Sequence, residues 1–230
     1  MVALVMAVER VEAGNNLKIN FKKMRKLFNE NEIKAIKEEI RRAELGSNGE
    51  IVPVFARSSG NYHAAKYIFT IFLTFIAATI TVKFSNSDSL LLLVLALSFI
   101  IGINIVGQFP ILCAPFITKS EMLEEVNRRA CEYFYSYNLD STHKGSALLI
   151  YTSCFEHITI VRTDLRSKEI VSHDELQEVC NLITQGMKNK KPTEGLINAI
   201  KKYGELLKKY FPNDSLINNN ELPNRIHFIN

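Results

Sequence analysis

Two long apolar blocks dominate the pattern of hydrophobic and polar positions along this chain. The first runs from about residue 64 to 82 and the second from about 90 to 112, with the polar link KFSNSDS between them. About 20 residues of apolar helix cross a bilayer core, and the second block holds no charged residue. The blocks therefore predict a two-span transmembrane helical hairpin over residues 62–117, whose ends emerge on one face of a membrane. The alternative is a helical hairpin buried in a soluble core.

The segment before the hairpin has the pattern of a soluble domain. Asn29 and Glu32 form a capping-box pair that opens a helix, and Gly46 is a natural end for that helix. Residues 50–57 follow as a strand with β-branched and aromatic positions. Pro53 has no N–H to donate to a sheet, so we expect this strand at an edge or with a bulge.

The soluble pattern resumes after the hairpin. A helix is expected from Thr118 to Tyr137, where apolar residues recur at helical spacing. Residues 146–153 and 157–164 alternate like the two strands of a β-hairpin. Two more amphipathic helices follow, over about 172–188 and 193–210.

This order predicts a discontinuous domain. Residues 29–61 and 118–211 would form one α/β domain, and residues 62–117 would be an insertion in one of its loops. Residues 1–28 form a separate N-terminal segment, and the Asn-rich residues 212–230 form a tail. Because both ends of the inserted hairpin return to the same membrane face, the domain can accept it without breaking its core.

The N-terminal segment contains a basic amphipathic pattern over residues 17–28. Apolar residues recur at spacings of four, three and four, and five cations occupy positions between them: Lys18, Lys22, Lys23, Arg25 and Lys26. One interpretation is a helix lying on an anionic membrane surface. The other is a lead-in to the first domain helix, with its lysines in water.

Charge around the apolar blocks predicts orientation. The hairpin loop has a single lysine, Lys83, whereas the flanks carry Arg57, Lys66, Lys119, Arg128 and Arg129. Cytoplasmic loops are enriched in Lys and Arg, so we expect the domain and both termini in the cytoplasm. The first eight residues lack the basic start and cleavage site of a signal peptide. The four cysteines contain no C-x-x-C pair, which fits a reducing compartment.

Composition and motifs argue against several classes of function. The net charge of +4 is a mild excess, and no zinc finger or aromatic RNA-binding strand is present, so no nucleic acid partner is expected. The five histidines form no helical pair for a metal, and no nucleophile elbow, Walker loop or dinucleotide fingerprint occurs.

Acidic residues near strand ends are the remaining candidates for chemistry. Glu50 begins the first strand, Asp140 precedes the β-hairpin, and Asp164 follows its second strand. Carboxylates at strand ends can converge and bind a divalent cation such as calcium. The alternative is that each is an ordinary turn or capping carboxylate.

Several motifs in order resemble those of the TPM domain family: AELGSNGEIVPVF, ACEYF, GSALLIYTSCFEHITIV, TEGLINAIKKYGELLKKYFP and NELPN. The match covers roughly residues 28–224 and includes Gly49, Glu156 and Gly195. It is closest to a bacterial membrane branch in which two spans interrupt the domain, so the resemblance implies a bacterial inner membrane protein. It also implies an α/β/α sandwich around a short mixed sheet.

The family's functions suggest two readings for this chain. Members are credited with acid phosphatase activity, with calcium binding, or with assembly and receptor-accessory roles. The glycine-containing turn usual after the second hairpin strand is replaced here by TDLRSKE, which leaves less room for a phosphate or metal. We therefore expect a membrane-anchored accessory or assembly protein, with the bilayer and another membrane protein as partners. The alternative is a weak metal-dependent acid phosphatase.

A third reading, a transport subunit, is disfavoured. Transport paths are marked by polar and ionisable groups within the spans. Here no charged residue lies in the middle of either span, and Asn104 is the notable polar group.

Overall fold

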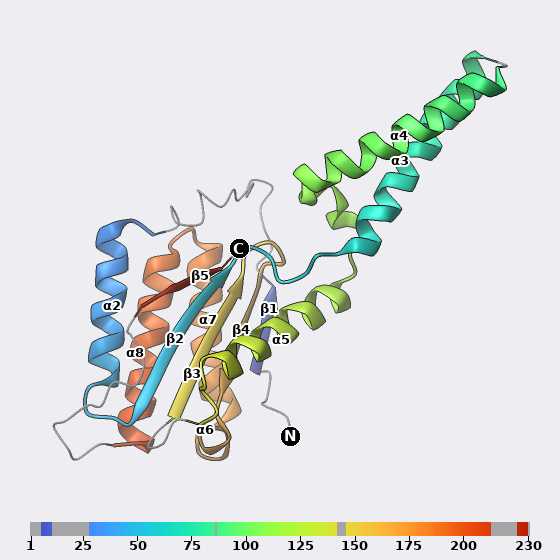
Figure 1. Cartoon of the computed structure of the whole chain (residues 1–230). Helices are drawn as coiled ribbons and strands as arrows, with labels where there is room; N and C mark the ends of the chain where they lie inside the picture. Colours follow the sequence, from blue (N-terminus) through green and yellow to red (C-terminus); the bar gives the residue numbers. More distant parts are fainter. Residues whose placement is uncertain (1–5, 11–27, 86, 142–145, 213–224, 230) are drawn as a thin grey trace. The chain divides into compact units, whose positions relative to one another are not determined.

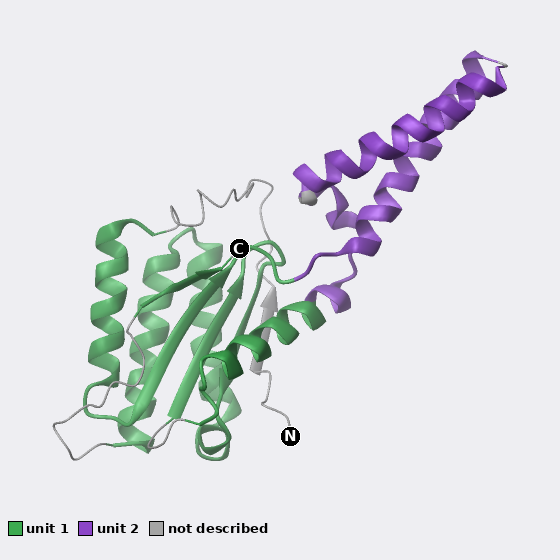
Figure 2. Ribbon diagram, viewed as in Figure 1, with its two compact units in different colours: residues 1–59, 123–230 green, residues 60–122 purple. Residues whose placement is uncertain are grey.

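The computed structural model describes residues 6–10, 28–85, 87–141, 146–212 and 225–229. The chain forms two compact units (Figure 2): an α/β unit of residues 1–59 and 123–230, and a hairpin unit of residues 60–122. These boundaries lie close to the residues 62 and 117 expected from the sequence.

A five-stranded mixed sheet forms the centre of the α/β unit (Figure 1). Its strands lie in the order β1-β4-β3-β2-β5 and span Met6–Arg10 (β1), Gly49–Ala56 (β2), Ser146–Ser153 (β3), Ile158–Thr163 (β4) and His227–Ile229 (β5). β2 runs parallel to β3 and β5, whereas β4 runs antiparallel to β3 and β1. The hairpin unit is therefore inserted between two neighbouring parallel strands, β2 and β3.

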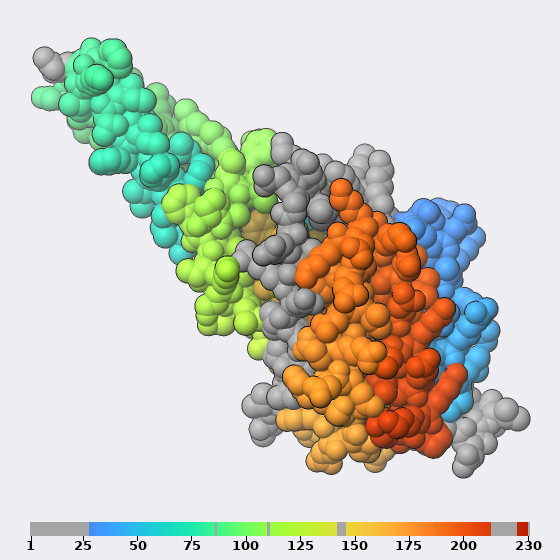
Figure 3. Space-filling view, turned by 180° about the vertical axis from the view of Figure 1, so that it is seen from behind, coloured from blue at the N-terminus to red at the C-terminus, as the bar shows by residue number. Residues whose placement is uncertain are grey.

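Helices cover both faces of the sheet, which confirms the expected α/β/α sandwich. One face is covered by α2 (Glu30–Glu44), α7 (His173–Lys188) and α8 (Pro192–Tyr210), which lie side by side in Figures 1 and 3. α5 (Lys119–Ser136) covers the other face with its residues from Leu123 onward. A short helix, α6 (Leu165–Ile170), connects β4 to α7.

The capping boxes read from the sequence explain where two of these helices begin. Asn29 and Glu32 cap each other's backbone N–H groups at the start of α2, and Ser172 and Glu175 do so at α7. α8 starts one residue before the expected Thr193, at Pro192, because proline suits the first helical position, where no N–H is needed.

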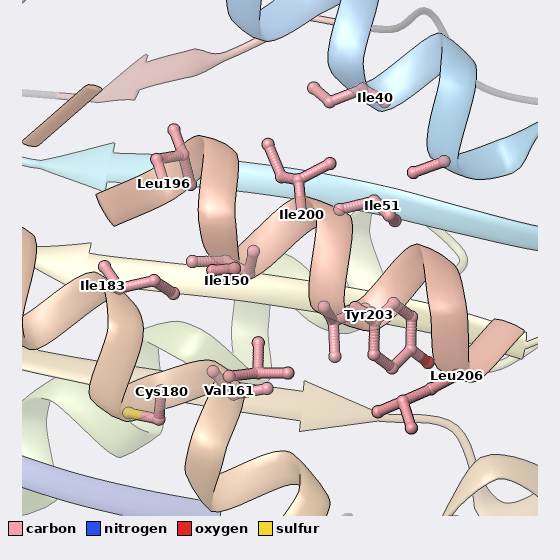
Figure 4. Packing of buried hydrophobic residues seen from close by; sticks show 14 of the residues in the cluster. Ile40, Ile51, Ile150, Val161, Cys180, Ile183, Leu196, Ile200, Tyr203 and Leu206 are labelled. Carbon is pink, nitrogen blue, oxygen red and sulfur yellow. The ribbon is translucent and has the colours of Figure 1, made fainter. Parts of the chain in front are cut away.

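The hydrophobic core lies between the sheet and the three-helix face (Figure 4). Ile40 of α2, Ile51 of β2, Ile150 of β3 and Ile200 of α8 are fully or almost fully buried and belong to one cluster. Every second residue of a strand faces the same side of the sheet, which is why Ile51 and Phe55 share this core. Burial of this surface is the main stabilising term of the unit.

α7 and α8 touch through two glycines, Gly186 and Gly195. A Cβ atom added to Gly195 would lie 2.7 Å from the Cα of Gly186 and 2.8 Å from the carbonyl oxygen of Leu182. Both obstacles are backbone atoms, so a larger residue would push the helices apart. The glycine of the TEGLINAI motif is therefore required by close helix packing.

Two strands lie outside the expected domain boundaries. β1 comes from the N-terminal segment and β5 from the expected tail, and they form the two edges of the sheet. β5 has three residues, too few to show an alternation that sequence reading can recognise. The basic residues 18–26 of the amphipathic pattern lie outside the described residues.

Pro53 sits where β2 needs no hydrogen-bond donor. β5 pairs with β2 over Val54–Ala56 only, so Pro53 lies next to an unpaired stretch of the strand edge. N–H groups of alternate residues point to the same side of a strand. On that side, the N–H of Ile51 donates to the buried Glu44 carboxylate at 2.9 Å and Arg57 N–H donates to Ile229. The expectation of an edge strand or a bulge is therefore wrong: β2 lies between β3 and β5 in continuous register with β3, and Pro53 fits because β5 is too short to reach it.

The hairpin unit consists of two long helices and a short 3₁₀ segment. α3 spans His63–Phe84, α4 spans Asp88–Gln108, and η1 spans Pro110–Phe116. The second helix ends before the expected residue 112, because a residue preceding proline, here Phe109, avoids helical geometry. Rings of Phe69 and Phe72 contact Phe116 and hold η1 against α3.

Candidate functional site

The most unusual surface of the protein is the apolar exterior of α3 and α4. The helices contain 22 and 21 residues, and only 6% and 11% of their most apolar stretches are buried within the structure. Large side chains such as Phe75, 68% exposed, point away from the protein all along both helices. Two helices are therefore long and apolar enough to cross a membrane. In the described part of the chain no core covers these side chains, contrary to the alternative of a hairpin buried in a soluble core.

The two helices approach each other closely at one point. Thr70 of α3 is fully buried against Gly102 of α4, and a Cβ atom on Gly102 would lie 2.8 Å from the Thr70 methyl carbon. Small residues allow such contacts between helices in an apolar solvent, where packing rather than the hydrophobic effect drives association. Thr70 also donates its hydroxyl to the Lys66 carbonyl at 2.9 Å, so it presents no unsatisfied polar group.

The structure brings two of the three expected acidic residues to one end of the sheet, where β2 and β3 begin. Glu50 pairs in register with Ala147 of β3, and the backbone N–H of Asp164 donates to the Ala147 carbonyl at 3.4 Å. Glu50 and Asp164 are both largely buried, whereas Asp140 is exposed. No group of three or more His, Cys, Asp or Glu side chains suited to a metal ion occurs in the described part of the chain. Binding of a divalent cation such as calcium here stays a prediction.

Asp164 already serves the fold as a helix cap. Its Oδ1 accepts the Ser167 N–H at 3.1 Å at the start of α6. Burial raises the pKa of Asp164, and the hydrogen bonds from Ser167 partly oppose this. Ser167 also contacts the Ser146 hydroxyl, which lies 2.6 Å from the Tyr203 hydroxyl. This end of β3 is therefore built mainly as a buried polar joint between β3, α6 and α8.

A second polar cluster lies at the opposite end of the sheet, beyond the carboxyl ends of β2 and β3. Its centre is Glu156, which is 1% exposed. Oε1 of Glu156 accepts the Ser59 N–H at 2.8 Å and the Ser58 hydroxyl at 3.1 Å, and Oε2 accepts the Ser153 hydroxyl. A buried carboxylate persists only with such donors. We call Glu156 and the residues bonded to it the exit cluster, because Ser58 and Ser59 are the last residues before the chain enters the hairpin unit.

Hydrogen bonds in the exit cluster run in one direction. The Ser59 hydroxyl donates to the Ser153 hydroxyl at 2.9 Å, and that hydroxyl donates to Glu156. A serine has one hydroxyl hydrogen, so the Tyr151 hydroxyl, 3.0 Å from that of Ser59, is the donor to it. Burial strongly raises the pKa of Tyr151, which keeps it protonated for this role.

α5 closes the cluster from the other side. The Nε of Arg129 donates to the Ser59 carbonyl at 3.2 Å, and its guanidinium pairs with Glu132 at 3.0 Å. The Tyr133 ring stacks on Tyr151 at 5.9 Å between centroids. Residues from the segment after β2, from β3, from the β3–β4 turn and from α5 therefore meet at the point where the chain leaves the α/β unit.

An aromatic row extends from this cluster to the edge strand β5. Tyr133 stacks on Tyr137, whose hydroxyl lies 2.9 Å from Nδ1 of His227. Burial and the nearby Arg225 lower the pKa of His227, which favours the neutral imidazole. This contact helps to hold the short β5 on the sheet.

The exit cluster has the features of a structural joint rather than of a catalytic centre. Glu156 is enclosed and bonded to three donors, so no substrate reaches it. Cys154 beside it is inert, because burial raises the pKa of its thiol to about 12. From the sequence, Glu156 stands out only as part of the GSALLIYTSCFEHITIV motif. The signal that could have found it is a carboxylate in a strand–turn–strand segment of otherwise apolar and hydroxyl residues.

Comparisons with known proteins bear on the fold. No family model and no curated protein matches this sequence. A solved structure that resembles it is the NMR structure of the BA42 protein from the psychrophilic bacterium Bizionia argentinensis. The two share 22% identity with a TM-score of 0.54, over 87% of this chain and 94% of that chain. At this identity the likeness shows the fold alone.

Proposed function

We propose that this protein is a membrane-anchored accessory or assembly factor, in which a TPM-like α/β domain is held at the membrane by the α3–α4 hairpin. The observation that carries the proposal is the exposed apolar exterior of both helices, beside an α/β unit whose hydrophobic cluster draws no described member from residues 60–122. A domain whose core is complete without its anchor is suited to bind a partner protein at the membrane.

The partner would be another membrane protein, and the domain would lie on the cytoplasmic face of a bacterial inner membrane. The tip of the hairpin carries one cation, Lys83, whereas the domain side carries Lys66, Lys119 and further cations. This asymmetry follows the positive-inside pattern. Asp164 caps α6 and Glu156 is enclosed among its hydrogen-bond donors, which supports a binding role over a hydrolytic one.

Orientation can be measured by cysteine labelling. In a background with Cys113, Cys131, Cys154 and Cys180 replaced by alanine, we expect Asn86→Cys to react with a membrane-impermeant maleimide in intact cells. Lys201→Cys, exposed on α8, is the matched control and should react only after permeabilisation. The reverse pattern would contradict a cytoplasmic domain.

The accessory role can be tested by purification of the tagged full chain in mild detergent after cross-linking in cells. We expect one membrane protein to be enriched at near-stoichiometric amount, and not with an unrelated two-span protein carrying the same tag. The hydrolase alternative makes the opposite prediction: the chain would purify alone. It would then hydrolyse p-nitrophenyl phosphate with a divalent cation, and Glu50→Gln and Asp164→Asn would each abolish that turnover.

A further inference from the structure

The connection from the α/β unit to the first apolar helix is very short. Only Gly60, Asn61 and Tyr62 separate Ser59 from the start of α3 at His63. A chain spans at most about 3.6 Å per residue, so Ser59 and His63 lie within about 14 Å of each other. The apolar surface of α3 begins at Tyr67, a further 6 Å or so along the helix. This limit comes from chain length alone.

The exit cluster fixes Ser59 in the α/β unit, so the connection to α3 cannot lengthen by unwinding the residues before Gly60. Ser59 is held through its N–H by Glu156 at 2.8 Å, through its carbonyl by Arg129 at 3.2 Å, and through its hydroxyl by Ser153 at 2.9 Å. All three polar groups of Ser59 are therefore engaged within the α/β unit. If α3 lies in a bilayer, the end of the sheet at Ser59 must stay within about 20 Å of the hydrocarbon, a distance that allows it to reach the headgroup layer.

The end of the sheet near Ser59 exposes a cation next to an aromatic residue. Arg57 is exposed and forms no ion pair with any residue that the structure describes. Its carbonyl accepts the N–H of Phe155 at 2.9 Å, so the β3–β4 turn, Cys154–His157, lies directly beside it. Phe155 and His157 are half-buried. We call Arg57 with this turn the edge turn.

The exposed charge of the edge turn is positive. Glu156 is the only carboxylate in the turn, and it is directed into the exit cluster and buried. What remains at the surface is the Arg57 guanidinium, with a partly exposed phenyl ring and imidazole. A guanidinium matches phosphate geometry, and the apolar ring of a phenylalanine can insert at the boundary between headgroups and acyl chains.

We propose that the edge turn is a lipid-contact surface, in which Arg57 binds the phosphate of anionic headgroups and Phe155 lies at the membrane–water interface. The proposal rests on the proposed membrane anchor, and adds that the domain itself touches the bilayer. The short connection after Ser59 keeps the edge turn within reach of the headgroups, and the burial of Glu156 removes the repulsion that a surface carboxylate would cause.

Tryptophan fluorescence can test this contact, because the chain contains no tryptophan. The full chain would be reconstituted in vesicles of phosphatidylcholine and phosphatidylglycerol, with and without lipids brominated near the headgroup. Three single substitutions serve as reporters. Phe75→Trp reports insertion of α3, and Phe155→Trp reports the edge turn. Leu165→Trp is the matched control, because Leu165 is 67% exposed on α6 at the other end of the sheet.

We expect Phe155→Trp to lose about half of its emission to brominated lipid, as befits a ring at the interface, and Leu165→Trp to lose almost none. Adding Arg57→Gln, or using vesicles of phosphatidylcholine alone, should reduce the loss for Phe155→Trp toward that of Leu165→Trp. His157→Trp is a second reporter in the same turn if Phe155→Trp does not fold.

The outcomes separate this inference from the anchor itself. Quenching of Phe75→Trp without quenching of either turn reporter would overturn the lipid contact and leave the anchor intact; a protein partner would then be the occupant of this edge. If the Phe155→Trp emission is quenched equally with and without Arg57→Gln, and equally in charged and uncharged vesicles, headgroup recognition by Arg57 would be overturned. Absence of quenching for Phe75→Trp would overturn the anchor and the inference together.

Discussion

A version of this protein in which residues 62–117 are replaced by a short flexible linker is expected to be soluble and to unfold in one cooperative transition. The buried cluster of the α/β unit contains side chains from α2, the sheet, α7 and α8, and no described member from residues 60–122. Removing the hairpin should therefore leave the core intact. A linker closes the loop at modest cost, since each doubling of loop length costs only about 0.6 kcal/mol.

Circular dichroism during heating, with size-exclusion chromatography, would measure this result. The matched control is the same hairpin-free chain with Ile150→Asp, which puts a charge at a fully buried core position and should abolish the transition. An insoluble product, or a soluble one without a cooperative transition, would show that the hairpin is part of the folding unit. It would also remove the main support for an anchored, independent domain.

The second large effect is expected at Glu156. Glu156→Ala leaves the Ser59 N–H and the hydroxyls of Ser58 and Ser153 without their acceptor. Because an unsatisfied buried donor costs about 1–3 kcal/mol, we expect a loss of about 3 kcal/mol in the free energy of unfolding. For a chain of this size that is a fall in Tm of about 6–12 °C. Glu156→Gln keeps one acceptor oxygen and should cost about half as much.

Thermal unfolding of the full chain in detergent would measure both variants. Glu178→Ala is the control, because Glu178 is an exposed carboxylate in a surface pair with Lys202 and should shift stability by no more than about 0.5 kcal/mol. Hydrogen exchange at Ser59 should also accelerate in Glu156→Ala and not in Glu178→Ala. Equal effects of Glu156→Ala and Glu178→Ala would contradict the role of Glu156 as the centre of the exit cluster.

Helices and the hairpin of this protein could be read from the sequence because their signals are local. Asn29 with Glu32 marks the start of α2, and an unbroken apolar run marks α4. The edge strands could not be read, since β5 is defined by its pairing with Val54–Ala56 and has no pattern of its own. Strand pairing between distant segments depends on tertiary context that local propensity does not contain.

The acidic residues likewise divide into those that the sequence could indicate and one that it could not. Sequence position placed Glu50 and Asp164 at strand ends, and strand register then brought them to the same residue, Ala147. The role of Glu156 depends instead on donors 97 and 98 positions away in the sequence, Ser59 and Ser58. No spacing rule links such residues before the fold is known.

The insertion of the hairpin between β2 and β3 also sets a timetable for synthesis. Ser146, the first residue of β3, is made 90 positions after Ala56, the last residue of β2. At about 5–20 residues per second, the ribosome needs roughly 5–18 seconds to supply the neighbour that β2 requires. During that interval both apolar helices leave the ribosome while β2 still has neither of its parallel partners. If the hairpin is the membrane anchor that we propose, both of its helices are therefore available for insertion before the domain that carries them has a sheet.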